Sequence, residues 1–134
     1  MWYNLLNDSL QEETMVNYFE SDFARPIILG DHKESISAAN LIKRKTTLSV
    51  TFVSNKLSVL NKIRFKHIIP SSESDDIVLL TLTDIPKHLP EYETPLLIYS
   101  KEHDEKFISE NLSLLETLYI LIPTEELKSF FEGI

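Results

Sequence analysis

The stretch "ARPIILGDHKESISAANLIKRK", residues 24–45, decides the fold. A short apolar run, Pro26–Leu29, ends in Gly30, and a segment with helical spacing begins at once. This pattern predicts a parallel strand that passes directly into a helix, as in nucleotide-binding and substrate-binding folds. Phosphate-cradling loops usually contain two or three glycines, and here there is one. Gly30 therefore either lets a ligand approach the backbone or simply ends the strand, and both interpretations stay open at this point.

The same alternation continues on both sides of this stretch. Upstream, Ser9–Glu12 fits a capping box that opens an N-terminal helix. The apolar residues of that helix are Leu10, Met15, Val16 and Phe19. Downstream, strands are expected near residues 47–53, 64–69, 95–99 and 118–122, in addition to 26–30. One helix is expected from Ser100 to Leu118, where the strand at 118–122 begins, and a final helix from Thr124 to Phe131. We divide the chain into an N-terminal helical segment, residues 1–23, and one domain, residues 24–134.

The segment from Ser74 to Ile85 fits two structures. Its β-branched residues favour a strand, whereas Ile77, Thr81 and Ile85 also share one helical face. Ser74 could cap such a helix, and the two aspartates after it would suit the positive end of the helix dipole. Parallel neighbouring strands need a long crossover connection, so we expect a helix here. The resulting fold class is a Rossmann-like three-layer α/β sandwich with a mostly parallel sheet of about five strands.

In such a sheet, ligands bind beyond the carboxyl ends of the strands, near the point where strand order reverses. The loops to consider are residues 30–35, 54–56 and 100–103. We expect the first and third of these turns to lie side by side in one cleft. The candidate substrate-binding residues are Gly30, Asp31, His32, Ser35, Ser100 and Glu102.

Composition restricts the class of protein. The chain has 134 residues, a net charge of −8 and no cysteine, which excludes disulfides and thiolate metal sites and makes a cytoplasmic location the default. The N-terminus lacks a secretory signal, and no apolar run is long enough to span a membrane. Residues 25–67 carry nine Lys/Arg against two acids. Aromatic residues are not interleaved with these bases, however, so we expect no nucleic-acid partner.

Markers of catalysis or metal binding are absent from the sequence pattern. The four histidines, His32, His67, His88 and His103, lack a metal-ligand spacing. There is no nucleophile elbow, and the acids of residues 71–76 read as a solvated loop before a helix. A phosphoacceptor receiver module would need paired acids after the first strand, which Gly30-Asp31 does not supply. We therefore predict no catalytic residue and no metal ligand in this chain.

Several stretches taken together resemble the N-terminal domain of ATP-grasp carboxylate–amine ligases. They are "PIILG", "SISAANLIKRK", "TLSVTFVSN", "FKHIIPS" and "PLLIYSKEHDEKFISENLSLLETLYILIP". The family places a strand and a glycine loop first, then a helix, a second strand, a short strand ending in proline and a crossover helix. The most specific part is a strand, an acidic turn, an "ISEN"-like helix at 108–111 and a strand ending at Pro123. The resemblance covers about residues 24–131.

The resemblance implies a domain that helps hold a small-molecule acceptor and is not catalytic by itself. Gly30 matches the family's first-loop glycine, and Glu102 its acidic turn residue. ATP and magnesium would bind in later domains, so no cofactor is expected in this chain. The first loop departs from the family because Asp31, His32 and Lys33 stand where relatives often have glycines. A stand-alone α/β binding or regulatory module is the alternative, and a homodimer is left open.

Overall fold

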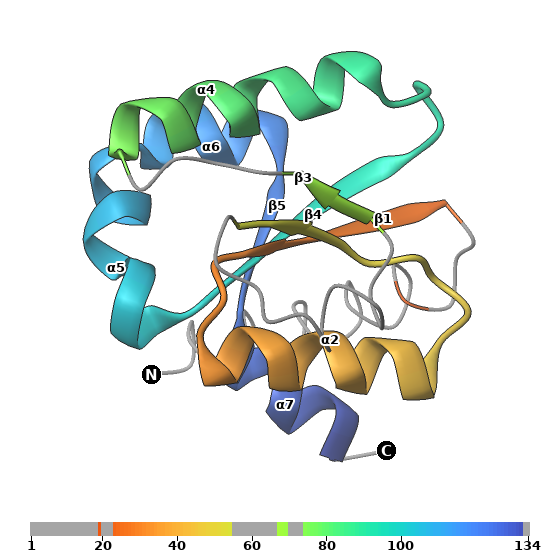
Figure 1. The fold of residues 1–134 in the computed structure, drawn as a ribbon. Coiled ribbons are helices and arrows are strands. Elements are labelled where there is room, and N and C mark those ends of the chain that lie inside the picture. The colour runs from red at the N-terminus through yellow and green to blue at the C-terminus, as the bar shows by residue number, and fades with distance from the viewer. Residues whose placement is uncertain (1–18, 20–22, 55–66, 70–73, 133–134) are drawn as a thin grey trace, which may run out of the picture.

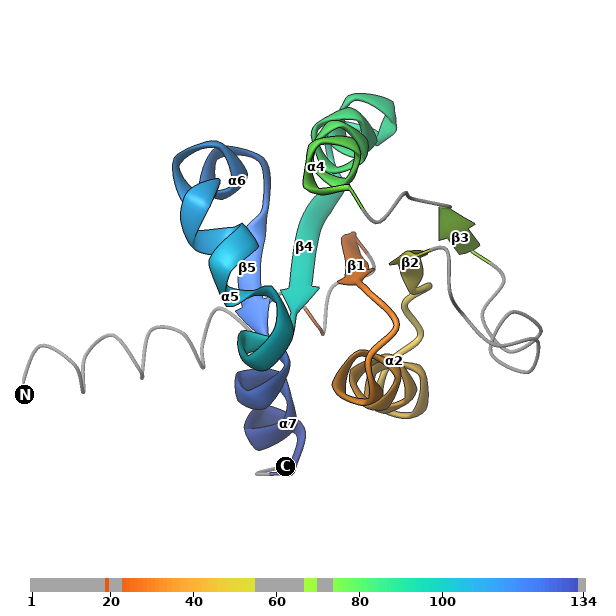
Figure 2. The same ribbon diagram turned by 60° about the vertical axis from the view of Figure 1, so that its left-hand side comes forward.

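A five-stranded parallel sheet forms the middle layer of the computed structural model, which describes residues 19, 23–54, 67–69 and 74–132. The strands are β1 (Ala24–Leu29), β2 (Thr51–Val53), β3 (His67–Ile69), β4 (Thr94–Tyr99) and β5 (Ile120–Pro123). Their order across the sheet is β3-β2-β1-β4-β5, and every neighbouring pair is parallel (Figure 2). The predicted Rossmann-like α/β class is confirmed.

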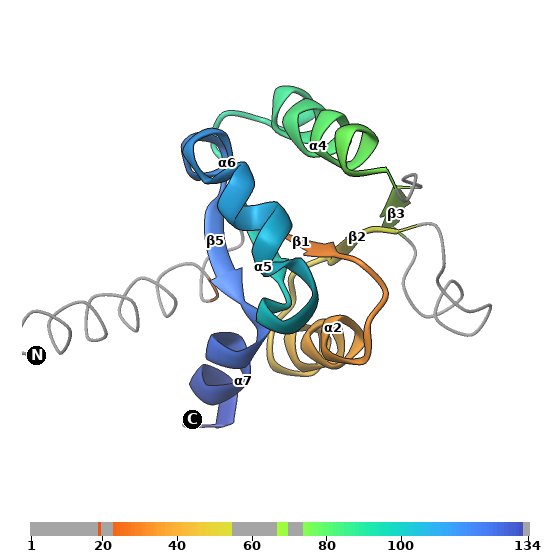
Figure 3. The same cartoon turned by 90° about the vertical axis from the view of Figure 1, so that its left-hand side faces the viewer.

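Helices cover both faces of this sheet (Figures 1 and 3). One face carries α2 (Lys33–Lys45) and α7 (Thr124–Glu132). The other carries α4 (Asp75–Asp84), α5 (Lys101–Glu110) and α6 (Leu112–Leu118), with a short 3-10 helix, Ile85–His88, after α4. The two faces bury separate apolar clusters because successive residues of a strand point to opposite sides. In β1, for example, Ile28 packs toward α2 and α7, whereas Ile27 and Leu29 pack toward the other helices.

The ambiguous segment after Ser74 is a helix, as predicted. Helix α4 provides the connection between the parallel strands β3 and β4, with Ser74 at its N-cap and two aspartates in its first turn. Its far end is tied to the rest of the layer, because the buried Tyr119 hydroxyl donates a 2.6 Å hydrogen bond to the Leu82 carbonyl. Pro86, four residues after Leu82, has no N–H to offer that carbonyl. Tyr119 therefore satisfies a backbone acceptor that the helix itself leaves open.

The second strand is shorter than predicted. Residues 47–50 were expected to be extended and paired, but β2 begins at Thr51. Thr46 ends α2, and its hydroxyl accepts a 3.1 Å hydrogen bond from the Leu48 N–H. This N–H therefore serves a turn and not the sheet. The β-branched composition of the segment predicted the strand correctly but not where pairing starts.

The region after β4 differs from the predicted single helix that runs into a strand at Leu118. Asn111 separates α5 from α6, and its side-chain amide donates to the Phe107 carbonyl at 2.9 Å. Asparagine commonly competes for backbone groups in this way. Leu118 is the last residue of α6, since the Tyr119 N–H still donates to the Leu115 carbonyl, and β5 starts at Ile120.

Parts of the expected N-terminal segment and third strand lie outside the described residues. These are the Ser9–Glu12 capping box and residues 64–66 of the strand predicted at 64–69. Phe19 is described: it is helical and buried, and its ring centroid lies 5.2 Å from that of Phe131 in α7. Phe19 thereby belongs to the apolar cluster that α2 and α7 form against the sheet.

Candidate functional site

The strand order reverses between β1, the central strand of the sheet, and its neighbour β4. Beyond β1 the chain turns into α2 on one face, and beyond β4 it turns into α5 on the other (Figure 1). The predicted turns, residues 30–35 and 100–103, lie side by side at this point. The His32 and His103 rings stack with centroids 3.8 Å apart and planes within 10°. We call the two turns and the helix starts that follow them the switch-point edge, residues 30–35 and 100–104.

Gly30 gives the first turn its shape. Its φ is +86°, a backbone conformation that glycine adopts without steric cost. Its N–H donates to the Val53 carbonyl at 3.0 Å, which ties the turn to the end of β2. A Cβ at this position would lie 3.1 Å from His32 Cδ2. The glycine is therefore required for the turn, and His32 lies directly against it.

Ser35 and Asp31 take different positions around that turn. Ser35 is fully buried, and its hydroxyl donates to the Leu29 carbonyl at 3.1 Å. That hydroxyl therefore faces the protein interior and holds the end of β1. The Asp31 side chain is half-buried. Of the predicted residues on this turn, His32 and Asp31 keep partly exposed side chains.

Ser100 and Asp104 fix the second turn through a reciprocal cap. The fully buried Ser100 hydroxyl accepts a hydrogen bond from the His103 N–H at 3.3 Å. The Ser100 N–H in turn donates to Asp104 Oδ2 at 2.9 Å. Burial raises the pKa of Asp104 above its ordinary value, and the Ser100 N–H and the charges of His32 and His103 partly oppose that rise. Ser100 thus positions the start of α5.

The raised pKa of Asp104 predicts a pH-dependent term in stability. Asp104 keeps its proton to higher pH in the native state than in the unfolded chain. Its contribution to the free energy of unfolding is therefore present at low pH and is lost as pH rises through the raised pKa. Asp104→Asn removes this loss while its amide oxygen can still accept from Ser100. In urea unfolding between about pH 3 and pH 7, the stability of the variant relative to wild type should therefore rise with pH.

A second substitution separates the cap from the effect of charge. Asp104→Ala removes the acceptor for the Ser100 N–H, so we expect it to be less stable than Asp104→Asn at every pH in this range, by about 1 kcal/mol. A relative stability of Asp104→Asn that falls as pH rises would contradict the assigned direction of the Asp104 pKa.

Two carboxylates lie near Nε2 of the His103 ring. His103 Nε2 lies 3.4 Å from Glu34 Oε2 and 4.0 Å from Glu102 Oε2. Glu34 stands in the first turn of α2 and Glu102 in the first turn of α5. Glu34 Oε2 is shielded from solvent and makes no hydrogen bond, although its ion-pair distance to His103 is short. We call His32, Glu34, Glu102 and His103 the imidazole–carboxylate cluster.

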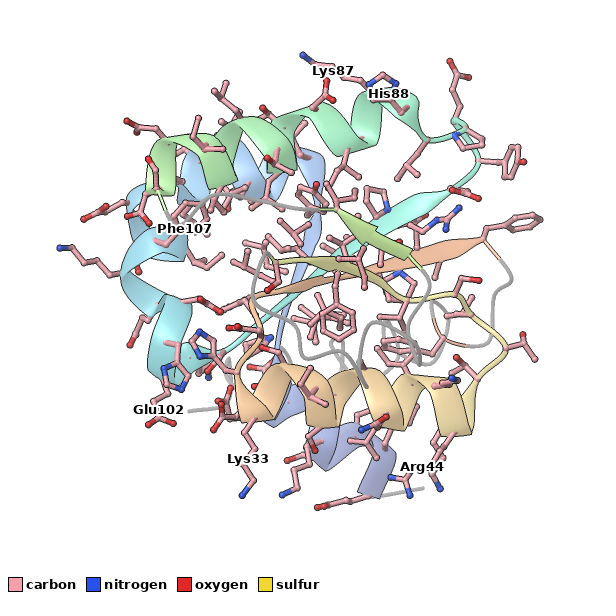
Figure 4. All side chains as sticks on the ribbon, viewed as in Figure 1. Lys33, Arg44, Lys87, His88, Glu102 and Phe107 are labelled. Atoms are coloured by element: carbon pink, nitrogen blue, oxygen red, sulfur yellow. The ribbon has the colours of Figure 1, made fainter. Side chains whose placement is uncertain are left out.

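Described residues line a cavity on each face of the sheet. One of about 320 Å³ opens between α2 and α7 and adjoins the cluster through Glu34; its lining is Lys33, Glu34, Ser37, Ala38, Leu41, Thr124, Glu125 and Lys128. The other, of about 450 Å³, includes Arg25 and Thr51 near the starts of β1 and β2, and is away from the predicted site. Lys33 and Glu102 lie at the same end of the molecule (Figure 4).

Gly30, His32, Ser100 and Glu102 were predicted at this edge. Glu34 and Asp104 were not among the predicted site residues, and His103 was not expected to be a metal ligand. Ligand spacing along one helix could not reveal the Glu34–His103 pair, because the two residues come from different helices. The capping pattern at Ser100 was the available signal for Asp104. Of the predicted loop 54–56, only Ser54 is described, and it is buried.

Comparisons with protein-family models, curated proteins and solved structures found no match to this chain. Within the described residues, no helix has the length and apolar character needed to cross a membrane.

Proposed function

We propose that this chain is the substrate-side N-terminal domain of an ATP-dependent carboxylate–amine ligase of the ATP-grasp type, and that it holds a small-molecule acceptor at the switch-point edge. The observation that carries the proposal is the meeting of the Gly30 turn and the Ser100 turn, shown by the stacked His32 and His103 rings. Ligands of parallel α/β sheets bind at this position.

The order of elements supports this proposal. A strand and Gly30 come first, followed by a helix, a second strand, a third strand, the crossover helix α4 and then β4. An acidic turn with Glu102, a helix containing residues 108–110 and a strand ending at Pro123 complete the series. This is the order that the resemblance implies over residues 24–131. Because one fold supports many activities, the case for a particular ligand must come from the side chains at the switch-point edge.

The edge offers groups for both ends of an amine-bearing carboxylate. His32, the N-cap residue of α2, makes no side-chain hydrogen bond to the first turn of the helix. The first N–H groups of α2 and the positive end of its dipole therefore favour an anion such as a carboxylate. Glu34 and Glu102 lie beside that helix start and favour an amine. An amino-acid-like acceptor fits this combination.

The test uses backbone amide NMR of the 134-residue chain. A panel of amino acids, small carboxylates and small amines should give saturable shifts confined to residues 30–35 and 100–104. Magnesium-ATP should leave these amides and the melting temperature unchanged, and the chain should hydrolyse no ATP. A ligand that binds only the native state would raise the melting temperature at high excess, so ATP binding would be visible.

Two outcomes separate the alternatives. A saturable melting-temperature shift with magnesium-ATP alone would contradict the substrate-side assignment and indicate a self-sufficient nucleotide-binding module. Acceptor binding at the edge, in a gene whose reading frame contains no ATP-binding domain after Ile134, would instead indicate a stand-alone α/β binding or regulatory module. A continuing frame with such a domain, together with acceptor binding at the edge, is the expected result.

A further inference from the structure

We infer that Glu34, Glu102 and His103 form a binding site for a divalent transition metal, with Zn²⁺ the best match. This inference stands on the imidazole–carboxylate cluster alone and does not depend on the proposed ligase function; zinc and an acceptor amine would compete for the carboxylates of Glu34 and Glu102. It also reverses the expectation from sequence spacing that the histidines of this chain are not metal ligands. The site combines one imidazole nitrogen with two carboxylate oxygens, from the first turns of α2 and α5.

The donor atoms are already close together. One atom from each of the three side chains lies within 4.8 Å of the other two. Ligand atoms about 2.1 Å from a tetrahedral Zn²⁺ would be about 3.4 Å from one another, so the separations within 4.8 Å must shorten by up to about 1.4 Å. Glu102 can supply much of this shortening, because its side chain is 70% exposed and lies on the surface.

The carboxylate of Glu34 also favours a cation here. Its Oε2 atom is shielded from solvent and has no hydrogen-bond partner, and His103 Nε2 lies 3.4 Å from it. A carboxylate oxygen removed from water is costly unless it is paired or bound to metal. A metal between Glu34 and His103 would satisfy this oxygen. The His32 ring stacks on the His103 ring and holds its plane in position for that contact.

The donor set favours zinc over magnesium or calcium. Magnesium and calcium prefer all-oxygen ligands, whereas imidazole suits zinc, copper, iron and nickel. Three protein ligands also leave one tetrahedral position open, as in zinc sites that bind a water or a substrate group. The cluster therefore has the ligand number of a zinc site with an open coordination position, and not that of a structural site with four protein ligands.

A simple ion pair between Glu34 and His103 is the competing explanation. It predicts no saturable zinc binding at this position, whereas the metal site predicts zinc binding that depends on both side chains.

The experiment measures Zn²⁺ binding by titration calorimetry on the full tag-free chain near neutral pH, with Co²⁺ absorption as a report of coordination geometry. We expect one site, no response to Mg²⁺, and at least about tenfold weaker binding in His103→Ala and in Glu34→Gln. His88→Ala is the matched control: His88 Nε2 pairs with Asp84 Oδ2 at 3.2 Å, is exposed, and lies away from Glu102 (Figure 4). This control should bind zinc like wild type.

Circular dichroism and metal-free melting curves of each variant show whether its fold is intact. Glu34→Gln keeps the size of the side chain, so it tests the site even if His103→Ala unfolds. A wild-type dissociation constant weaker than about 100 μM would overturn the inference. So would undiminished binding in the folded Glu34→Gln variant, or a loss of binding in His88→Ala comparable to that in His103→Ala.

Discussion

Replacing Leu115 with alanine is expected to lower the free energy of unfolding by about 2–5 kcal/mol. Leu115 lies in α6 and is fully buried in the apolar cluster that α4, α5 and α6 form against the sheet. Truncation removes apolar contacts and leaves a cavity that close-packed neighbours fill only in part. Urea unfolding followed by circular dichroism would measure the change.

Leu114→Ala is the control, because it makes the same chemical change at the preceding position of the same helix. The Leu114 side chain is 43% exposed, so little buried surface is lost, and we expect a change within about 0.5 kcal/mol. Helix propensity changes equally in both variants and cancels from the comparison. Equal losses in the two variants would show that α6 does not pack as described.

Gly30→Val is expected to destabilise the protein by about 1–3 kcal/mol. A φ of +86° is a genuine outlier for a β-branched residue. The added Cβ would also lie 3.1 Å from His32 Cδ2, so the ring must move or the turn must open. Gly30→Ala carries the same Cβ without the branch and should lose less, about 1–2 kcal/mol. Thermal and urea unfolding of both variants would measure this order.

The same substitution has a functional consequence under the proposed ligase role. If Gly30 shapes the acceptor site, Gly30→Val in a protein that also carries an ATP-binding domain should weaken acceptor use and leave ATP binding intact. The measurement is a pair of saturation curves, one for acceptor and one for ATP. Equal weakening of both would indicate general unfolding, and weakening of ATP alone would place Gly30 in a nucleotide site.

Local patterns in the sequence were sufficient for the fold class. Apolar runs such as Leu96–Ile98 can be buried only where both faces of a sheet are covered, so they predicted a parallel sheet between helices. The segment after Ser74 was ambiguous by composition, and the length of chain needed between parallel strands decided it correctly. Gly30 was identifiable because the strand pattern stops there and a helix pattern starts.

Element boundaries depended on contacts that no local pattern contains. Residues 47–50 have strand-like composition, yet Thr46 engages Leu48 in a turn, and pairing with β1 begins only at Thr51. Leu118 fitted both the helix before it and the strand after it. The Tyr119 N–H bond to Leu115 keeps Leu118 in α6, because the chain must complete that helical turn before it enters β5.

The candidate site shows the same division. The sequence by itself determined that turns follow Gly30 and Tyr99 and that helices begin after both, because these are local preferences of glycine, serine and acidic residues. The expectation that these two turns lie side by side is confirmed, but the side chains that meet there were decided only by the tertiary structure, through the pairing of β1 with β4. That pairing brings Glu34 within 3.4 Å of His103, although the two residues belong to different helices on opposite faces of the sheet. Strand order is a property of the whole sheet, so no spacing within either segment could have revealed the pair.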